Sequence, residues 1–95
     1  MKLPQKGFYY HYKHNPKLGI NDHAYEVIGV ARHSEDHSYV VVYKPLYKSE
    51  FSAKVDYCVR PLEMFMEEVS VNGNEMPRFR KIDDADVIQK IIKAV

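Results

Sequence analysis

The chain has 95 residues, of which 45% are hydrophobic and 28% are charged. These proportions are typical of one small globular domain, and they exclude both a disordered polar chain and a chain with two separate cores. The 14 basic side chains nearly balance the 13 acidic ones, so the formal net charge is +1. A chain so close to neutral has no general electrostatic attraction to nucleic acid or to an anionic membrane.

Cysteine content and the lengths of the apolar runs bear on the compartment. Cys58 is the single cysteine and cannot form an internal disulfide, which fits a reducing environment. No apolar run approaches the roughly 18 residues of a membrane span, and residues 1–6 lack the apolar core of a secretion signal. We therefore expect a cytoplasmic protein with no membrane segment and a flexible N-terminus at residues 1–6.

An aromatic segment and a turn-rich loop follow this N-terminus. Residues 8–13 alternate in the manner of a strand, with Tyr9 and His11 on the same face. If aromatic side chains formed stacking platforms for single-stranded nucleic acid, the outward candidates would be Tyr9, His11, Tyr43 and Tyr47. Aromatic residues in a small barrel are more often core and rim, and we expect that arrangement here. Residues 14–23 contain Asn-Pro, Leu-Gly and Asn-Asp pairs without periodicity, which predicts a surface loop.

The central part of the sequence predicts a long hairpin. An apolar strand runs from about residue 24 to residue 32, where Gly29 permits a bulge. The polar residues 33–38 then turn the chain into a second arm at 39–43. Pro45 cannot donate a ladder hydrogen bond, so the second arm should bulge or become an edge there.

A short strand and a helical turn come next. Residues 57–60 predict the strand, and Pro61 suits the first position of a helical turn. In that turn three apolar side chains would face inward, and these are Leu62, Phe65 and Met66.

The sequence then predicts a hairpin and a C-terminal helix. Residues 68–71 alternate, Asn72-Gly73 is a favoured two-residue turn, and residues 76–80 can pair back. Residues 83–95 predict a helix that Asp83 caps. Its apolar stripe must be buried on the sheet or against a second copy, and consists of Val87, Ile88, Ile91, Ile92 and Val95.

These elements predict a mainly β (α+β) fold. We expect a small antiparallel, partly open barrel like that of Src-homology-3 (SH3) domains over residues 7–80, with one short helical turn. The helix at residues 83–95 would pack on the barrel or on a partner. A ferredoxin-like sandwich is disfavoured, because the first half lacks a long helical pattern.

Several of these segments resemble a family of small bacterial proteins, domain of unknown function 1653. The resembling pieces are residues 7–13, 25–35, 41–43, 46–47, 59–65 and 77–79. The resemblance implies a bacterial protein with one compact domain, but it implies no activity and no catalytic residue. Three features depart from the family pattern: a longer loop at 14–23, Cys58 where tryptophan is expected, and the added C-terminal helix.

Polar residues at the strand ends predict a site for an anion. Arg32, His33 and Glu35 follow the central strand, and a guanidinium can bind phosphate or carboxylate through two hydrogen bonds. Arg60 is the second candidate cation, because it precedes a helical turn whose free amides favour anions. Tyr47 and Glu63 complete the candidate ligand-binding set. The alternative left open is that both arginines form structural salt bridges, Arg32 with Glu26, Glu35 or Glu63.

Metal and cofactor binding are not expected. His11 with His14, and His33 with His37, are spaced to hold a metal ion. Zinc sites, however, need three or four ligands, and the chain has neither a cysteine pair nor a His-Glu-x-x-His helix.

Three functions remain open. The favoured one is a non-catalytic module that binds a nucleotide, RNA or a carboxylate-bearing partner, with RNA binding weak because the net charge is small. The second is a hydrolase or transferase that acts on a phosphorylated substrate, with His33 and either Glu35 or Glu63 as acid and base. The third is a protein–protein interaction or dimerisation module that uses the C-terminal helix. The sequence does not decide between a monomer and a homodimer.

Overall fold

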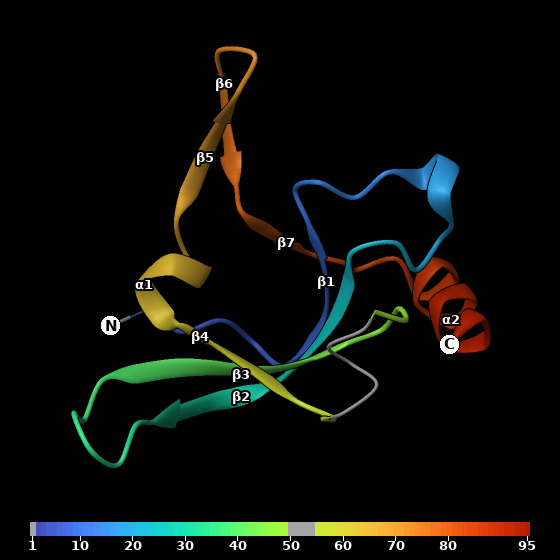
Figure 1. The fold of residues 1–95 in the computed structure, drawn as a ribbon. Helices are drawn as coiled ribbons and strands as arrows, with labels where there is room; N and C mark the ends of the chain where they lie inside the picture. Colours follow the sequence, from blue (N-terminus) through green and yellow to red (C-terminus); the bar gives the residue numbers. More distant parts are fainter. Residues whose placement is uncertain (1, 50–54) are drawn as a thin grey trace.

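A computed structural model of the chain describes residues 2–49 and 55–95. The larger of two sheets contains β1 (Gly7–His11), β2 (Ala24–Arg32), β3 (Tyr39–Pro45), β4 (Cys58–Pro61) and β7 (Phe79–Lys81) (Figure 1). A separate hairpin pairs β5 (Glu68–Val71) with β6 (Asn74–Pro77). The helical elements are the 3-10 turn η1 (Pro16–Leu18), α1 (Leu62–Phe65) and α2 (Ala85–Ala94). The mainly β fold class is confirmed.

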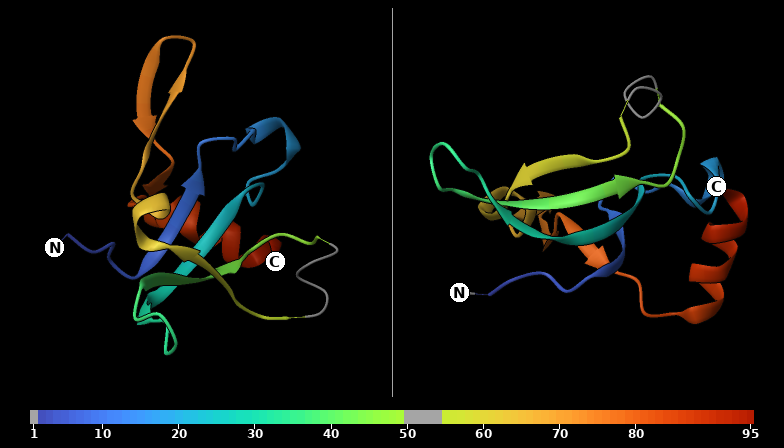
Figure 2. Two further views of the ribbon diagram at one scale, coloured as in Figure 1. Left: turned by 60° about the vertical axis from the view of Figure 1, so that its left-hand side comes forward. Right: turned by 90° about the horizontal axis from the view of Figure 1, so that it is seen from below.

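The five-stranded sheet is antiparallel and open. Its strand order is β4-β3-β2-β1-β7. Within the described residues the edge strands β4 and β7 do not pair with each other, so the sheet is not a closed barrel. It is nevertheless strongly twisted (Figure 2). The likeness to an SH3 barrel and the proposed division at residues 1–6, 7–80 and 83–95 stay predictions.

A β-bulge in β2 adds to the twist of the sheet. Val27 pairs with Tyr43, but the next pair is Gly29 with Val42, so Ile28 is an extra residue on β2. The bulge predicted near Gly29 is therefore confirmed. β3 continues to Pro45 without a bulge.

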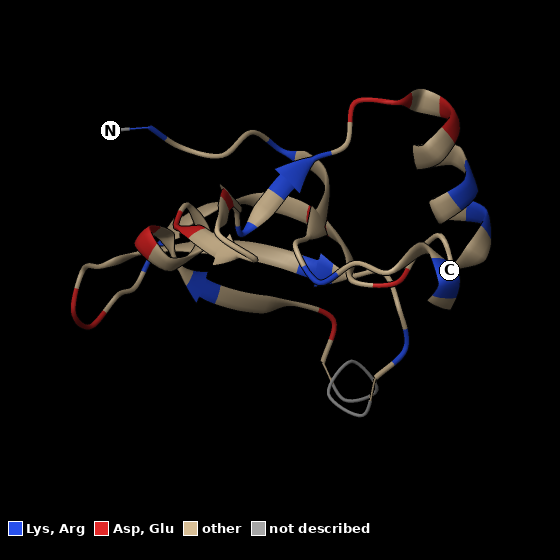
Figure 3. Ribbon diagram, turned by 90° about the horizontal axis from the view of Figure 1, so that it is seen from above, with Lys and Arg blue, Asp and Glu red and all other residues tan. Residues whose placement is uncertain are grey.

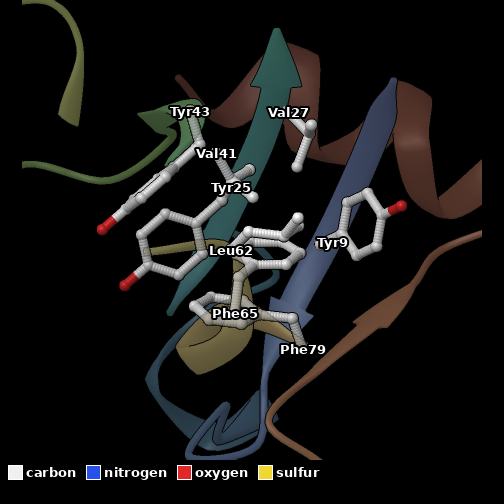
Figure 4. Close-up of a cluster of buried hydrophobic side chains, with 8 residues drawn as sticks. All are labelled: Tyr9, Tyr25, Val27, Val41, Tyr43, Leu62, Phe65 and Phe79. Carbon is white, nitrogen blue, oxygen red and sulfur yellow. The ribbon is translucent and has the colours of Figure 1, made fainter. Parts of the chain in front are cut away.

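Both faces of the sheet are covered by apolar side chains. One face carries the first core cluster, drawn in Figure 4, which consists of Tyr9, Tyr25, Val27, Val41, Tyr43, Leu62, Phe65 and Phe79. The opposite face carries a second cluster, which consists of Tyr10, Ala24, Leu46, Ile82 and Ile91. Alternate residues of β1 thus enter different cores, because successive strand residues point to opposite faces.

The aromatic residues considered as outward stacking candidates are mostly buried, as the core interpretation predicts. Tyr9, His11 and Tyr43 are only 6%, 8% and 6% exposed. Alternation correctly placed Tyr9 and His11 on one face, and the first core cluster lies on that face. In α1, Leu62 and Phe65 are buried as expected, whereas Met66 is 38% exposed and does not belong to the core.

The hairpin turn at Asn72-Gly73 is confirmed. Both residues have positive φ angles, 53° and 81°, as a two-residue hairpin turn requires. The predicted return strand at 76–80 is wrong in its extent, because β6 ends at Pro77 and β7 pairs with β1 instead. The β5–β6 hairpin projects away from the larger sheet (Figure 1).

Helix α2 begins later than the sequence predicts. Asp84, and not Asp83, is the N-cap residue, and its carboxylate accepts hydrogen bonds from the amides of Asp86 (2.9 Å) and Val87 (3.4 Å). The Asp83 carboxylate instead forms an ion pair with Lys81 at 3.1 Å. Within the described residues, no helix has the length and apolar character needed to cross a membrane.

Only part of the predicted apolar stripe of α2 packs on the sheet. Ile91 is completely buried in the second core cluster, and Val87 and Ile88 pack against the rim of that cluster. Ile92 and Val95 are 48% and 67% exposed. The helix is thus anchored on its own sheet through one side of the stripe.

This packing predicts unequal effects of two isoleucine substitutions. Ile91→Ala should lower the free energy of unfolding by about 2–5 kcal/mol, because it leaves a cavity in the core. The matched control Ile92→Ala should change it by less than about 1 kcal/mol. Urea unfolding followed by circular dichroism measures both values. Equal losses in the two variants would mean that α2 does not pack as described.

Candidate functional site

Five aromatic side chains from distant parts of the chain meet above one face of the sheet. We call this group the aromatic cluster, and it consists of His11, His23, Tyr25, Tyr47 and Phe79. Neighbouring ring centroids within it lie 5.0 to 5.6 Å apart and form a closed circuit. Three of the five contacts are edge-to-face, with interplanar angles of 79° to 82°, which is a favourable arrangement of aromatic quadrupoles.

The circuit closes because the pairing register brings its members together. His11 in β1 pairs with Phe79 in β7, and the His11 amide donates to the His23 carbonyl at 3.0 Å. Tyr25 in β2 pairs with Pro45, two residues before Tyr47. Strand pairing thus gathers side chains that are up to 68 positions apart, the separation of His11 and Phe79.

Arg60 lies against this cluster. It pairs with Val41 on the face of the sheet that carries the first core cluster, and its guanidinium carbon is 5.2 Å from the centre of the Phe79 ring. Its Nη1 lies 3.9 Å from the sulfur of Met64. Among the described residues, no carboxylate forms an ion pair with Arg60. The structural salt bridge considered for Arg60 is therefore not observed among these residues.

His11 reports the electrostatic environment of the cluster. Burial is the main factor that lowers the pKa of His11, from 6.5 to about 4, and the nearby His23, Arg60, Lys13 and Arg78 lower it further. The Nδ1 atom of His11 accepts a hydrogen bond from the Lys13 amide at 3.2 Å. His11 is therefore neutral at physiological pH, and three permanent cations lie close enough to influence it.

One of these cations is only partly paired. The Nη2 atom of Arg78 lies 3.4 Å from a carboxylate oxygen of Glu67. The Nε atom of Arg78 is buried and has no hydrogen-bond partner among the described residues. A buried donor without a partner costs free energy unless a ligand or water satisfies it.

Two phenol groups supply further hydrogen-bonding capacity. The hydroxyl groups of Tyr25 and Tyr47 lie 2.5 Å apart. Burial, and then the hydrogen bond with Tyr47, raises the pKa of Tyr25 well above its ordinary value. Tyr25 therefore stays protonated and acts as a hydrogen-bonding group rather than as a base.

The other predicted residues lie at the β2–β3 turn and on α1. The His33 amide donates to the Ser38 carbonyl at 2.7 Å, and the Glu35 amide lies 3.2 Å from the His33 Nδ1 atom. These contacts, together with the 3.6 Å approach of His33 to Asp36, hold the turn. His33 and Glu35 are exposed, and no described residue forms an ion pair with Arg32.

The structure thus divides the predicted site. Tyr47 and Arg60 both act on Tyr25, the former by its hydrogen bond and the latter through its charge. Arg32 and Arg60 lie on the two strands that flank β3. The pairing register and ordinary strand spacings place their Cα atoms about 12 Å apart. Glu63 lines a hollow of about 400 Å³ that none of the other predicted residues lines.

Sequence reasoning missed most of the aromatic cluster. His11 was considered only as an outward stacking candidate or a metal ligand, and His23 was assigned to a surface loop. Tyr25, Arg78 and Phe79 lie in segments that carry the family resemblance, which is the signal that could have identified them.

Among residues 2–49 and 55–95, no group of three or more histidine, cysteine or acidic side chains is arranged to hold a metal ion.

The low pKa of His11 predicts a pH-dependent stability. The unfolded chain binds a proton at His11 below about pH 6.5, whereas the folded chain does so only near pH 4. The contribution of neutral His11 to the free energy of unfolding is therefore complete above pH 6.5, and it is lost as the pH falls toward 4. Between pH 7.5 and pH 5 this loss should be about 2 kcal/mol in the free energy of unfolding.

Urea titrations at these two pH values test the prediction. His11→Gln should remove most of this pH dependence. The exposed His37 has a positive φ of 62°, which asparagine tolerates, so His37→Asn is the matched control and should keep the wild-type dependence. An unchanged pH dependence in His11→Gln would show that His11 titrates normally.

Comparisons with known proteins place the chain in a family. The family model described as "Protein of unknown function (DUF1653)" matches residues 7–81, which include every strand but not α2. A crystal structure of a DUF1653 protein from Bordetella bronchiseptica is similar, with a TM-score of 0.66 and 30% sequence identity over 83% of this chain and 87% of that chain. No curated protein sequence matches significantly. The chain belongs to the DUF1653 family.

Proposed function

We propose that the protein is a non-catalytic binding module that holds an anionic ligand beside Arg60 and the aromatic cluster. The observation that carries the proposal is an excess of positive charge. Arg60, Lys13 and Arg78 all act on the partly enclosed His11, and only Arg78 has a carboxylate partner among the described residues. An anion bound there would offset charge that the described part of the fold leaves uncompensated.

The chemistry of the surrounding groups favours an oxyanion. Arginine presents several N–H donors in a planar fork, which matches phosphate and carboxylate oxygens. The Nε atom of Arg78, which has no hydrogen-bond partner among the described residues, supplies a further donor. The low exposure of the cluster strengthens each charge–charge interaction, since the effective dielectric constant is lower than in water. These features support a nucleotide, an RNA phosphate or a carboxylate as the bound group.

Binding is favoured over hydrolysis by the positions of the candidate acid and base. Glu63 lines a hollow together with Ser38, Tyr39, Pro61 and Leu62, and His33 is not part of that hollow. The Nδ1 atom of His33 is already in contact with the turn. General acid–base catalysis requires both groups within reach of one substrate, and His33 does not share the hollow that Glu63 lines.

A thermal-shift screen tests the proposal with nucleoside mono- and triphosphates, short RNA oligomers, sugar phosphates and dicarboxylates as probes. A probe that binds only the folded state at 100 times its dissociation constant stabilises it by about 2.7 kcal/mol. We expect Arg60→Ala to abolish the shift. Arg80→Ala is the matched control, because the Arg80 guanidinium lies 5.3 Å from the ring of Tyr10, which belongs to the other core cluster, and should retain the shift.

The His11 ring gives an independent readout of where the probe binds. An anion beside Arg60 should raise the pKa of His11 from about 4, since it offsets the cations that help to keep the ring neutral. Histidine ring signals followed by NMR through a pH titration measure this change. A thermal shift that survives in Arg60→Ala, without a change in the pKa of His11, would place the ligand elsewhere and refute the proposed site.

A further inference from the structure

A second surface, separate from the aromatic cluster, surrounds the exposed ring of Tyr39. Two hollows of about 500 Å³ and 400 Å³ share this residue. We call their joint lining the Tyr39 groove, and the residues that matter are Leu3, Val30, Arg32, Tyr39, Pro61 and Glu63. Neither hollow is lined by a member of the aromatic cluster.

Strand pairing orders the groups along the groove. Arg32 in β2 pairs directly with Tyr39 at the start of β3. The next residue of β3, Val40, pairs with Pro61 at the end of β4, and α1 with Glu63 follows. Arg32 on β2 and the segment after β4 that carries Glu63 therefore lie on opposite sides of β3, whose two neighbouring strands are about two strand spacings, or about 10 Å, apart.

The groove is apolar in the middle and charged at both ends. Tyr39 is 44% exposed and Leu3 is 49% exposed, so both present apolar surface to a ligand. Arg32 at one end and Glu63 at the other have no ion-pair partner among the described residues. Arg32 lies on β2 and Glu63 on α1. Figure 3 shows that basic and acidic residues are otherwise interspersed along the chain.

We propose that the Tyr39 groove binds an extended peptide segment of a partner protein, with an acidic side chain at Arg32, an apolar side chain on Tyr39 and a basic side chain at Glu63. Alternate residues of an extended chain face the same way and lie about 6.8 Å apart. Residues i, i+2 and i+4 of an extended peptide therefore present three side chains in the order of the three groups.

Charge complementarity distinguishes a peptide from a nucleic acid here. Phosphate groups along an oligonucleotide would meet the Glu63 carboxylate, and like charges repel. A peptide with one acid and one base satisfies both ends of the groove. This site is independent of the anion site at Arg60, so the two proposals can fail separately.

The test uses three capped pentapeptides with the sequences Asp-Ala-Leu-Ala-Lys, Asp-Ala-Leu-Ala-Asp and Lys-Ala-Leu-Ala-Lys. NMR titration of the full chain measures each dissociation constant. The wild type should bind the mixed-charge peptide about two- to fivefold more tightly than either other peptide, the range expected of exposed ion pairs.

Charge-swap variants then identify the two ends. Arg32→Glu should prefer the peptide with two lysines, Glu63→Lys should prefer the peptide with two aspartates, and the double variant should again prefer the mixed peptide. Tyr39→Ala should weaken binding of all three. Tyr57→Ala is the matched control, because Tyr57 is 55% exposed and lines neither hollow, and it should bind as the wild type does.

The same titrations contain the outcomes that would overturn the proposal. One is an unchanged order of peptide affinities in the charge-swap variants, and another is unaltered binding in Tyr39→Ala. Tighter binding of an oligouridine probe than of any peptide, lost in Arg32→Glu, would assign the groove to nucleic acid instead. Amide spectra of each variant confirm that the fold is retained, which is expected because all four substituted side chains are exposed.

Discussion

The contacts of the Phe79 ring hold this open sheet in its curved form. The ring stacks on Phe65 of α1 with a centroid separation of 4.2 Å and an interplanar angle of 6°, as Figure 4 shows. The Arg60 guanidinium, from the opposite edge strand of the sheet, lies 5.2 Å from the same ring. Phe79 therefore joins β7 to α1 and β4 by side-chain contacts where the described strands make no edge-to-edge hydrogen bonds. Packing and a cation–π interaction take the place of the missing ladder.

This arrangement also explains why the cationic groups gather. Arg60 stays on the inner face because its guanidinium rests on an aromatic ring rather than on a carboxylate. His11 is then buried beside it in the neutral form, which avoids a further buried charge. The result is a region in which aromatic surface, hydroxyl groups and unbalanced cations coincide. The proposed anion site thus lies among the same contacts that join the two edges of the open sheet.

The Tyr39 groove has a different physical character. Its charged ends are exposed and opposite in sign, so each charge is screened by water and contributes to selectivity more than to affinity. The aromatic cluster is enclosed and has one predominant sign of charge. The two proposals thus place an anion beside Arg60 and a peptide at the Tyr39 groove of one small domain. Both places adjoin β3, since Val41 pairs with Arg60 and Tyr39 pairs with Arg32.

Local patterns in the sequence determined the strands, the Asn72-Gly73 turn, the bulge at Gly29 and the existence of α2, because each depends on the conformational preferences of neighbouring residues. They also identified Arg60 and Tyr47 as candidate site residues. The tertiary structure alone decided which faces are buried, since alternation assigns Tyr9 and His11 to one face but cannot show what covers that face. It likewise decided that Phe79 leaves the hairpin to pair with β1, and that Arg32 and Arg60 lie on opposite sides of β3. These outcomes depend on strand order, and strand order is set by contacts between residues far apart in the chain.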